Sequence, residues 1–171
     1  MGAVAMVRFG IVLLIALLCA PSAGAQSPTP AGVWLHENKR IEVEIAPCGD
    51  LLCGKIVWFK WPNDANGLPL VDLKNADPAL RNRPLLGLTV LYGLRRTGDN
   101  TWEDGYIYNP DDGKNYRASM SIQNDGSLRI RAYLLIPLIG HTFIWTRVDF
   151  DRLTEPSSRE PLSSPSVTQP R

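Results

Sequence analysis

Two of the three cysteines in this chain of 171 residues, Cys48 and Cys53, lie five positions apart in the stretch APCGDLLCGKIVW. Two close thiols can form a disulfide, supply half of a metal site or carry out thiol–disulfide exchange. A redox pair is typically a C-x-x-C at the start of a helix, and a tetrahedral zinc site needs two further ligands. The spacing alone leaves these three chemistries open, so the cellular compartment becomes the deciding question.

The N-terminal segment predicts export from the cytoplasm. Arg8 precedes a short apolar run, residues 9–20, and an A-G-A sequence follows, which is the pattern of a secretory signal peptide. We expect residues 1–25 to be cleaved off together with Cys19, and residues 26–30 to form a short linker. The apolar run is too short for a membrane span of about 20 residues. We therefore expect no transmembrane span after signal cleavage and a location in the periplasm or outside the cell.

An oxidising compartment makes a disulfide the simplest interpretation of the cysteine pair. Cys48 ends one predicted strand, Cys53 precedes the next, and the four residues between them fit a hairpin loop. The other good metal ligands are two histidines, His36 and His141, which are distant in sequence and which we expect to be structural or solvated. We predict a Cys48–Cys53 disulfide, no metal site and no cofactor.

One acid, Asp104, is the strongest candidate for acid–base chemistry. In the stretch TWEDGYIY it has the same strand parity as Trp102, Tyr106 and Tyr108, which predicts an acid on an aromatic strand face. The opposite interpretation is that Gly105 marks a bulge, or that this face points to solvent. The sequence lacks a G-x-S-x-G nucleophile elbow before a helix. We expect no enzymatic activity, with a hydrolase or isomerase that uses Asp104 as an alternative.

A long irregular segment, residues 62–87, carries two arginines that are two positions apart, Arg81 and Arg83. Long loops are often functional, and an arginine pair can bind a carboxylate or a phosphate through parallel hydrogen bonds. Alternatively, both arginines pair with Asp72 and Asp77 and hold the loop in place. The arginines are therefore candidate ligand-binding residues with a structural alternative.

The elements that must position these residues are β-strands. Residues 40–45 alternate polar and apolar side chains, as in a strand with one wet and one dry face. Asp-Gly pairs at 112–113 and 125–126 are strong hairpin signals, and Asp77 followed by Pro78 predicts one helical turn. The predicted strands are residues 32–36, 39–47, 54–61, 88–96, 101–109, 115–122, 128–135 and 140–148.

About eight strands joined mostly by hairpins predict an all-β fold, an antiparallel meander closed as a small barrel, because closure removes exposed strand edges. A two-sheet β-sandwich is the alternative. The interior of an eight-stranded barrel is filled by side chains or holds one small ligand. Indoles and tyrosines suit an apolar or planar ligand with a polar handle. The predicted ligand-binding residues are Trp58, Trp102, Asp104, Tyr108, Arg81 and Arg83.

The remaining composition limits the domain and its partners. Residues 151–171 are rich in proline and serine, and they carry too few large apolar residues to offset their chain entropy, which predicts disorder. Residues 31–150 then form a single domain. The net charge is +1 without a basic cluster, which disfavours nucleic-acid binding.

Four stretches of the chain resemble a known bacterial family. They are a G-x-W opening with a C-G-D…C-G-x-I hairpin at 32–58, a D-x-x-N…D-P-x-L-R-x-R-P-L-x-G loop at 72–88, a W-x-x-G-x-I-Y-x-P-x-D-G-K-x-Y hairpin at 102–116 and a G-x-T-x-x-W-x-R strand at 140–148. Together they resemble the bacterial exported domain-of-unknown-function family 2147. The resemblance implies a periplasmic or secreted single-domain protein without an established activity, and it transfers no catalytic residue.

A fold-level resemblance to lipocalins adds one expectation. Lipocalin-like barrels open with G-x-W and place an arginine from a late strand over that tryptophan. Trp34 and Arg147 match these positions, so the resemblance implies a lipocalin-like barrel in which Arg147 stacks on Trp34 and plugs one end. Unlike the lipocalins, this chain shows no helix after the barrel.

These observations predict an uncharacterised exported β-barrel that binds a small, partly apolar ligand without catalysis. The alternative is a cell-envelope interaction or structural module with a filled core, whose loops contact another protein. The expected partner is a small apolar or planar ligand, or an envelope protein, and not nucleic acid. A hollow interior would favour ligand binding, whereas conspicuous apolar loop tips would favour the interaction module.

Overall fold

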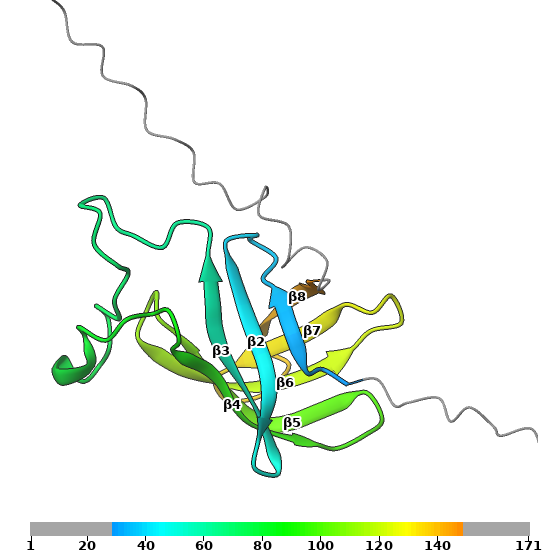
Figure 1. Ribbon diagram of the computed structural model, residues 1–171. Helices are drawn as coiled ribbons and strands as arrows, with labels where there is room; N and C mark the ends of the chain where they lie inside the picture. The colour runs from blue at the N-terminus through cyan, green and yellow to red at the C-terminus, as the bar shows by residue number, and fades with distance from the viewer. Residues whose placement is uncertain (1–28, 149–171) are drawn as a thin grey trace, which may run out of the picture.

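The computed structural model describes residues 29–148, so the predicted signal peptide and C-terminal tail lie outside the described residues. Within that range the chain forms eight β-strands and one short 3-10 helix, shown in Figure 1. The elements are β1 Gly32–Leu35, β2 Ile41–Cys48, β3 Leu51–Phe59, η1 Pro78–Leu80, β4 Thr89–Arg96, β5 Thr101–Asn109, β6 Lys114–Ile122, β7 Leu128–Tyr133 and β8 Gly140–Arg147. Each predicted strand is present, and so is the predicted helical turn.

The strands form a closed antiparallel barrel in which each strand pairs with the next along the chain. The barrel closes where β8 pairs with β1, through Trp34 opposite Arg147 and Leu35 opposite Thr146. This topology confirms the predicted meander barrel and excludes the sandwich. Each strand therefore has a partner on both sides, which removes the open sheet edges on which another chain could add a strand.

The alternation of the sequence explains which side chains form the core. In β7, for example, Leu128 and Ile130 are buried while Arg129 between them is exposed, because successive strand residues point to opposite faces. The same pattern in the other strands supplies the rest of the core. The large side chains buried almost completely are Trp34, Trp145, Ile45, Leu91, Leu94, Met120, Leu128 and Ile130.

Two irregularities in strand pairing reverse this alternation. A register shift beside Glu42, where β2 pairs with β3, places Trp58 opposite the outward Glu42 and Phe59 opposite the inward Ile41. A second shift lies in β5 after Trp102 and contains Asp104, whose φ of 62° is left-handed. Bulges of this kind insert one extra residue, so the strand faces exchange beyond them. They decide which aromatic residues can reach the interior.

One end of the barrel is closed by Trp34 and Arg147. Trp34 is fully buried, and the guanidinium carbon of Arg147 lies 4.3 Å from the centre of its ring. The same guanidinium donates to the carbonyl oxygens of Ala31, at 2.8 Å, and Thr29, at 2.7 Å. The indole N–H of Trp34 donates to the carbonyl of Pro30 at 2.7 Å. The stacking implied by the lipocalin resemblance is present, and the hydrogen bonds of Arg147 also hold the segment that enters the barrel.

Cys48 and Cys53 form the predicted disulfide, with their Cα atoms 5.8 Å apart. The hairpin that it joins is tighter than expected, because Cys48 pairs directly with Leu51 and only Gly49 and Asp50 make the turn. Gly49 has a φ of 68°, which glycine adopts without strain. The disulfide is therefore a staple within the β2–β3 hairpin.

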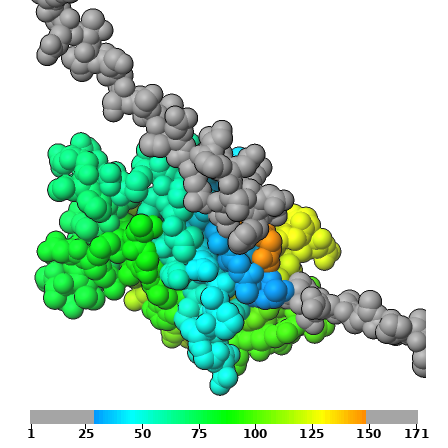
Figure 2. Space-filling model, viewed as in Figure 1, coloured from blue at the N-terminus to red at the C-terminus, as the bar shows by residue number. Residues whose placement is uncertain are grey.

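The long loop, residues 60–88, joins β3 to β4 and packs beside the barrel, at the left of Figure 2. It is internally ordered: the carboxylate of Asp64 accepts hydrogen bonds from the backbone N–H groups of Asn66 and Leu68, both at 2.9 Å. Asp77 caps η1 by accepting from the N–H of Ala79 at 2.9 Å, as predicted. No helix in residues 29–148 is long and apolar enough to cross a membrane.

Candidate functional site

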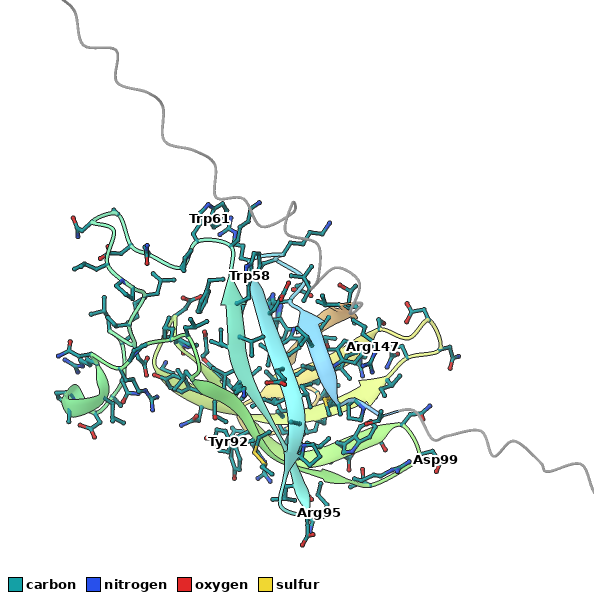
Figure 3. All side chains as sticks on the ribbon, in the orientation of Figure 1. Trp58, Trp61, Tyr92, Arg95, Asp99 and Arg147 are labelled. Atoms are coloured by element: carbon teal, nitrogen blue, oxygen red, sulfur yellow. A yellow bond between two sulfur atoms is a disulfide. The ribbon has the colours of Figure 1, made fainter. Side chains whose placement is uncertain are left out.

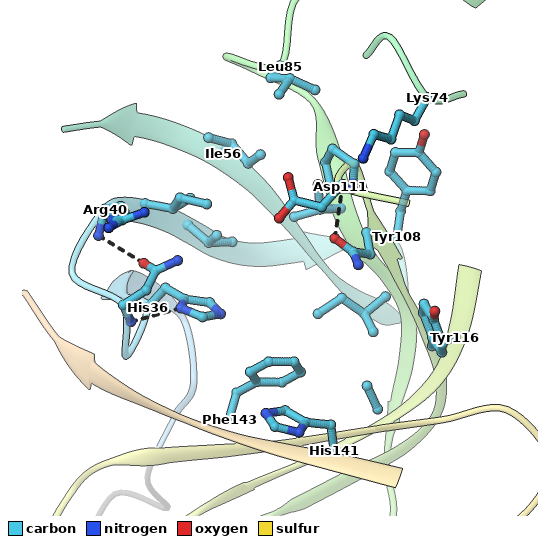
Figure 4. Close-up of a pocket in the computed structure, with 18 of the residues that line it drawn as sticks. His36, Arg40, Ile56, Lys74, Leu85, Tyr108, Asp111, Tyr116, His141 and Phe143 are labelled. Atoms are coloured by element: carbon cyan, nitrogen blue, oxygen red, sulfur yellow. Dashed lines mark hydrogen bonds between the residues drawn. The ribbon is translucent and has the colours of Figure 1, made fainter. Parts of the chain in front are cut away.

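The barrel is hollow at the end opposite Trp34 and Arg147. A cavity of about 860 Å³ opens there, between the β1–β2 turn, the long loop, the β5–β6 hairpin and the β7–β8 loop. Figure 4 shows Ile56 and Phe143 on opposite sides of this space. The deep wall is apolar and is made of Ile41, Val43, Ile56, Phe59, Val90, Ile107, Ala132, Phe143 and Trp145. A cavity of this size and character accommodates one small molecule.

The mouth of the cavity carries polar and charged side chains beside exposed apolar ones. In Figure 4, His36 and Arg40 lie on one side of the opening, and Lys74 and Asp111 lie on the other. The polar side chains that line the mouth are His36, Asn38, Arg40, Lys74, Asn109, Asp111, Tyr116, Tyr133 and His141. The cavity is thus apolar in its depth, and charged and polar groups occur only towards its opening, which suits an amphiphilic molecule.

The two histidines of the chain both line this cavity. The ring of Phe143 lies between them, 5.3 Å from the ring of His36 and 4.6 Å from that of His141. The Nδ1 atom of His36 accepts a hydrogen bond from the N–H of Asn38 at 3.1 Å, so the neutral ring carries its proton on Nε2. Burial lowers the pKa of His36, against a smaller opposing effect of Glu37. A neutral imidazole therefore stands at the cavity mouth near pH 7.

The apolar wall contains one unpaired donor. Trp145 is only 2% exposed, and its Nε1 has no hydrogen-bond partner within residues 29–148. Leaving a buried donor unpaired costs about 1–3 kcal/mol. The indole of Trp145 forms part of the cavity wall. Its Nε1 is the one buried side-chain donor within residues 29–148 that lacks an acceptor.

A buried hydrogen-bond network holds the long loop against the barrel beside the cavity. Asp72 is fully buried and accepts hydrogen bonds from the hydroxyl of Tyr108 at 2.6 Å, from the amide of Asn75 at 2.8 Å and from Nε of Arg83 at 2.9 Å. Burial alone would raise the pKa of Asp72, but these donors overcome that effect and hold the pKa below its usual value. Burial and the adjacent carboxylate raise the pKa of Tyr108.

A close backbone contact completes this attachment. Gly113, in the β5–β6 turn, approaches the long loop so closely that a Cβ atom there would lie 1.8 Å from the carbonyl oxygen of Lys74. Only glycine fits this position, which also has a φ of 71°. The network and this contact together fix Lys74 at the cavity mouth.

The predicted arginine pair belongs to this scaffold and not to the cavity lining. Arg83 forms an ion pair with Asp72 at 2.8 Å, and Nε of Arg81 donates to the carbonyl oxygen of Asn75 at 2.9 Å. Neither arginine is among the residues that line the cavity. The predicted alternative, in which a loop arginine pairs with an aspartate, is therefore correct for Arg83 and Asp72. Asp77 pairs with neither arginine and caps η1 instead.

The expectation that Asp104 shares a strand face with Trp102 is wrong, although Asp104 and Tyr106 are both exposed on the outer surface. The β5 bulge turns Asp104 to the outer surface, where about half of its side chain is exposed and it forms an ion pair with Arg95. Trp102 on one side of the bulge is buried in the barrel, and Tyr106 on the other side is exposed. The interpretation in which Gly105 marks a bulge is the correct one.

The predicted aromatic residues take three different positions. Trp58, labelled in Figure 3, is paired with the outward Glu42 by the β2–β3 bulge and does not line the cavity, and Phe59 lines it instead. Trp102 fills the core, with the guanidinium of Arg96 5.9 Å from its ring. Tyr108 does line the cavity, while its hydroxyl is held by Asp72. Of the six predicted ligand-binding residues, Tyr108 alone contributes to the described cavity.

Sequence reasoning missed the residues that come from turns at the open end. His36, Arg40 and Lys74 each stand in or beside an irregular segment, where period-two patterns give no information on direction. Phe143 could have been found, because it shares strand parity with the buried Trp145 in β8. No group of three metal-ligating side chains is assembled within residues 29–148.

A closed eight-stranded meander with one hollow end, and with an arginine over the opening tryptophan, defines a lipocalin-like barrel. Residues 32–147 match the model of the family described as an uncharacterised protein conserved in bacteria (DUF2147), and the chain belongs to that family.

Among solved structures, the chain is similar to protein HP1028 from the human pathogen Helicobacter pylori, which is described as belonging to the lipocalin family. The two are 24% identical with a TM-score of 0.62, over 72% of this chain and 85% of that chain, and the likeness shows a shared fold. No curated protein matches the chain.

Proposed function

We propose that this protein binds a small, partly apolar ligand in the open end of its barrel, without catalysis, in the periplasm or outside the cell. The observation that carries the proposal is the cavity of about 860 Å³, which is apolar in its depth and carries polar and charged groups at its mouth. A ligand with an apolar body and a polar or anionic head fits this gradient, because Arg40 and Lys74 stand at the opening.

The fold supports the same function. Eight-stranded barrels are just wide enough to hold one small ligand, and the structurally similar Helicobacter pylori protein is described as a lipocalin-family member. The cavity argues against an interaction module whose core is filled, while the exposed apolar loop at residues 134–139 is the feature that was expected of such a module. A hydrolase or isomerase that uses Asp104 is disfavoured, because Asp104 lies on the outer surface beside Arg95, and Asp111 is the one carboxylate that lines the described cavity.

The proposal is tested with 1-anilinonaphthalene-8-sulfonate, a fluorescent molecule with an apolar body and an anionic group. We expect saturable binding to the full-length protein as exported by its host. The variant Ala132→Trp fills the cavity, because Ala132 is buried in its wall. It should weaken binding at least about tenfold, equivalent to about 1.4 kcal/mol.

The matched control is Ile144→Trp, which adds an indole to a residue of β8 that is 40% exposed and does not line the cavity. This control should bind the probe as the wild type does, and near-ultraviolet circular dichroism checks that both variants keep their fold. Equal binding by Ala132→Trp and wild type, or equal loss in both variants, would overturn the proposal.

Export is tested separately. Under the proposal, protein recovered from the periplasmic fraction or the culture medium begins at Gln26, the residue after the predicted cleavage site. N-terminal sequencing measures this directly, and an uncleaved chain found only in the cytoplasm would contradict it.

A further inference from the structure

The β7–β8 connection ends in an unusually apolar tip. The apolar loop, residues 134–139, has the sequence LLIPLI, and Leu135, Leu138 and Ile139 are 88%, 84% and 75% exposed. Leu134 and Ile136 are also exposed, at 62% and 48%. Five large aliphatic side chains in one exposed loop form the kind of contiguous patch that marks an interaction site.

Three carbonyl groups of the apolar loop, those of Ile136, Pro137 and Leu138, already accept hydrogen bonds within the protein. The side chain of Arg131 donates to the carbonyl oxygens of Pro137, at 2.5 Å, and Leu138, at 3.0 Å. The N–H of Ile139 donates to the carbonyl oxygen of Ile136 at 3.1 Å, and Pro137 has no N–H group to satisfy. Three successive carbonyl groups therefore need no water. This matters because an unpaired backbone group is costly in a hydrocarbon environment.

Cationic and aromatic residues surround the loop. Leu134 and Ile139 line the same cavity mouth as Arg40, Lys74 and Trp61. Trp61, seen at the top of Figure 3, is 54% exposed, and Arg40 and Lys60 lie 5.1 Å and 5.0 Å from the centre of its ring. Asp111 is the carboxylate at this opening. Exposed indoles and long basic side chains suit the headgroup layer of a membrane.

We propose that the open end of the barrel docks on a lipid bilayer. The apolar loop enters the acyl-chain region, while Arg40, Lys60 and Lys74 lie at the level of anionic headgroups. We commit to a bilayer as the occupant, because an exposed aliphatic tip beside basic side chains and an exposed indole matches the change from acyl chains to anionic headgroups. The paired carbonyls point the same way.

This docking is independent of ligand binding, but it has a consequence that rests on the proposed function. With the loop inserted, the cavity mouth opens onto the bilayer surface, because Leu134 and Ile139 are part of the apolar loop and also line the cavity. An amphiphilic ligand could then pass between the bilayer and the cavity without exposing its apolar part to water.

The test is vesicle flotation with the full-length processed protein. Two compositions are used, phosphatidylcholine alone and phosphatidylcholine mixed with phosphatidylglycerol. We expect binding to both, with more than about tenfold tighter binding to the anionic vesicles, because each of the three basic residues near an anionic surface contributes about fivefold. Added salt should remove this difference and leave the binding to phosphatidylcholine.

The decisive variant is Leu135→Ser/Leu138→Ser, which should lower partitioning to both compositions at least about tenfold. The matched control is Leu68→Ser/Leu86→Ser, two leucines of the long loop that are 62% and 55% exposed and lie outside the cavity lining. It should float as the wild type does. Absence of flotation, or equal loss in both double variants, would overturn the proposal.

Two further measurements separate this proposal from its competitors. Sedimentation without vesicles reports self-association, and a dimer that Leu135→Ser/Leu138→Ser dissociates, without vesicle binding by the wild type, would assign the loop to a second copy instead. Neither Leu135 nor Leu138 lines the cavity, so the double variant should still bind 1-anilinonaphthalene-8-sulfonate. The docking and the ligand-binding proposals therefore fail independently.

Discussion

At the scale of single residues, Asp72 shows how one buried group positions a segment that lacks regular structure. Its carboxylate gathers donors from the long loop, Asn75 and Arg83, and from the barrel, Tyr108. The sequence predicted that Asp72 could pair with a loop arginine. It did not predict Tyr108, which is 36 residues away and whose outward face is covered only because the loop folds over it.

The substitution Asp72→Asn should lower the free energy of unfolding by about 1–3 kcal/mol. The loss arises because Asn keeps the size of the side chain but cannot accept from all three donors. The loss of stability is no larger than this because the Arg83 side chain is 34% exposed, so water partly solvates its charge when the aspartate is removed. Urea unfolding measures the change, and hydrogen exchange should show faster exchange at Asn75.

The control for this substitution is Asp99→Asn, which changes an exposed carboxylate in the β4–β5 turn, labelled in Figure 3. It should leave stability within about 0.5 kcal/mol of the wild type. Equal effects of the two substitutions would mean that the network does not anchor the loop.

His36 gives a prediction on pH. Burial lowers its pKa in the folded protein, so the unfolded chain binds more protons between that pKa and about 6.5. The His36 contribution to stability is therefore complete above about pH 6.5 and is lost as the pH falls towards the folded pKa. NMR titration of the ring should give a midpoint below about 6.5. His36→Asn should reduce the loss of stability between about pH 7.5 and pH 5.5; a midpoint above the ordinary value would contradict the burial.

At the scale of elements, the strands and their turns were predictable, but the direction of individual side chains was not. Strict alternation located β2, β6 and β7 and their inward residues. The bulges beside Glu42 and after Trp102 break that alternation, and they depend on pairing with neighbouring strands, which a single strand's pattern does not encode. For this reason Trp58 and Asp104 were assigned to the wrong faces.

The disulfide is an element-scale feature with a limited role. Replacing both Cys48 and Cys53 by serine should lower the free energy of unfolding by about 2 kcal/mol, because the closed loop is short in the chain-entropy model. The pair lies in the β2–β3 hairpin away from the cavity lining. Binding of 1-anilinonaphthalene-8-sulfonate should therefore be unchanged, as measured at a temperature where the variant is folded. Unchanged stability with lost binding would refute the role as a staple.

At the scale of the whole molecule, the barrel could be predicted, but its hollow end could not. Whether an eight-stranded barrel is filled depends on the summed volume of all inward side chains. Here large residues such as Trp34 and Trp102 fill one end, whereas Ala132 and Val43 leave space at the other. No single stretch of sequence contains that sum, because these residues come from different strands.

The closed end should contribute to stability without affecting binding. Arg147→Met removes the stacking on Trp34 and the hydrogen bonds to Thr29 and Ala31, and we expect it to lower the free energy of unfolding by about 1–3 kcal/mol. The control, Arg129→Met, changes an exposed arginine of β7. Urea unfolding compares the two, and affinity for 1-anilinonaphthalene-8-sulfonate should stay constant in both; equal stability of the two variants would argue against a plug.

The plug formed by Arg147 also brings together both ends of the described chain. Arg147 bonds to Thr29, and the N–H of Val148 donates to the carbonyl oxygen of Val33 at 2.9 Å. Both ends therefore leave the barrel at its closed end, remote from the cavity mouth. A tether or tag on either side would hold the molecule by its base with the mouth facing outward. A short peptide joining residues 29 and 148, with new termini in the β6–β7 turn, should give a circular permutant that keeps the same cavity.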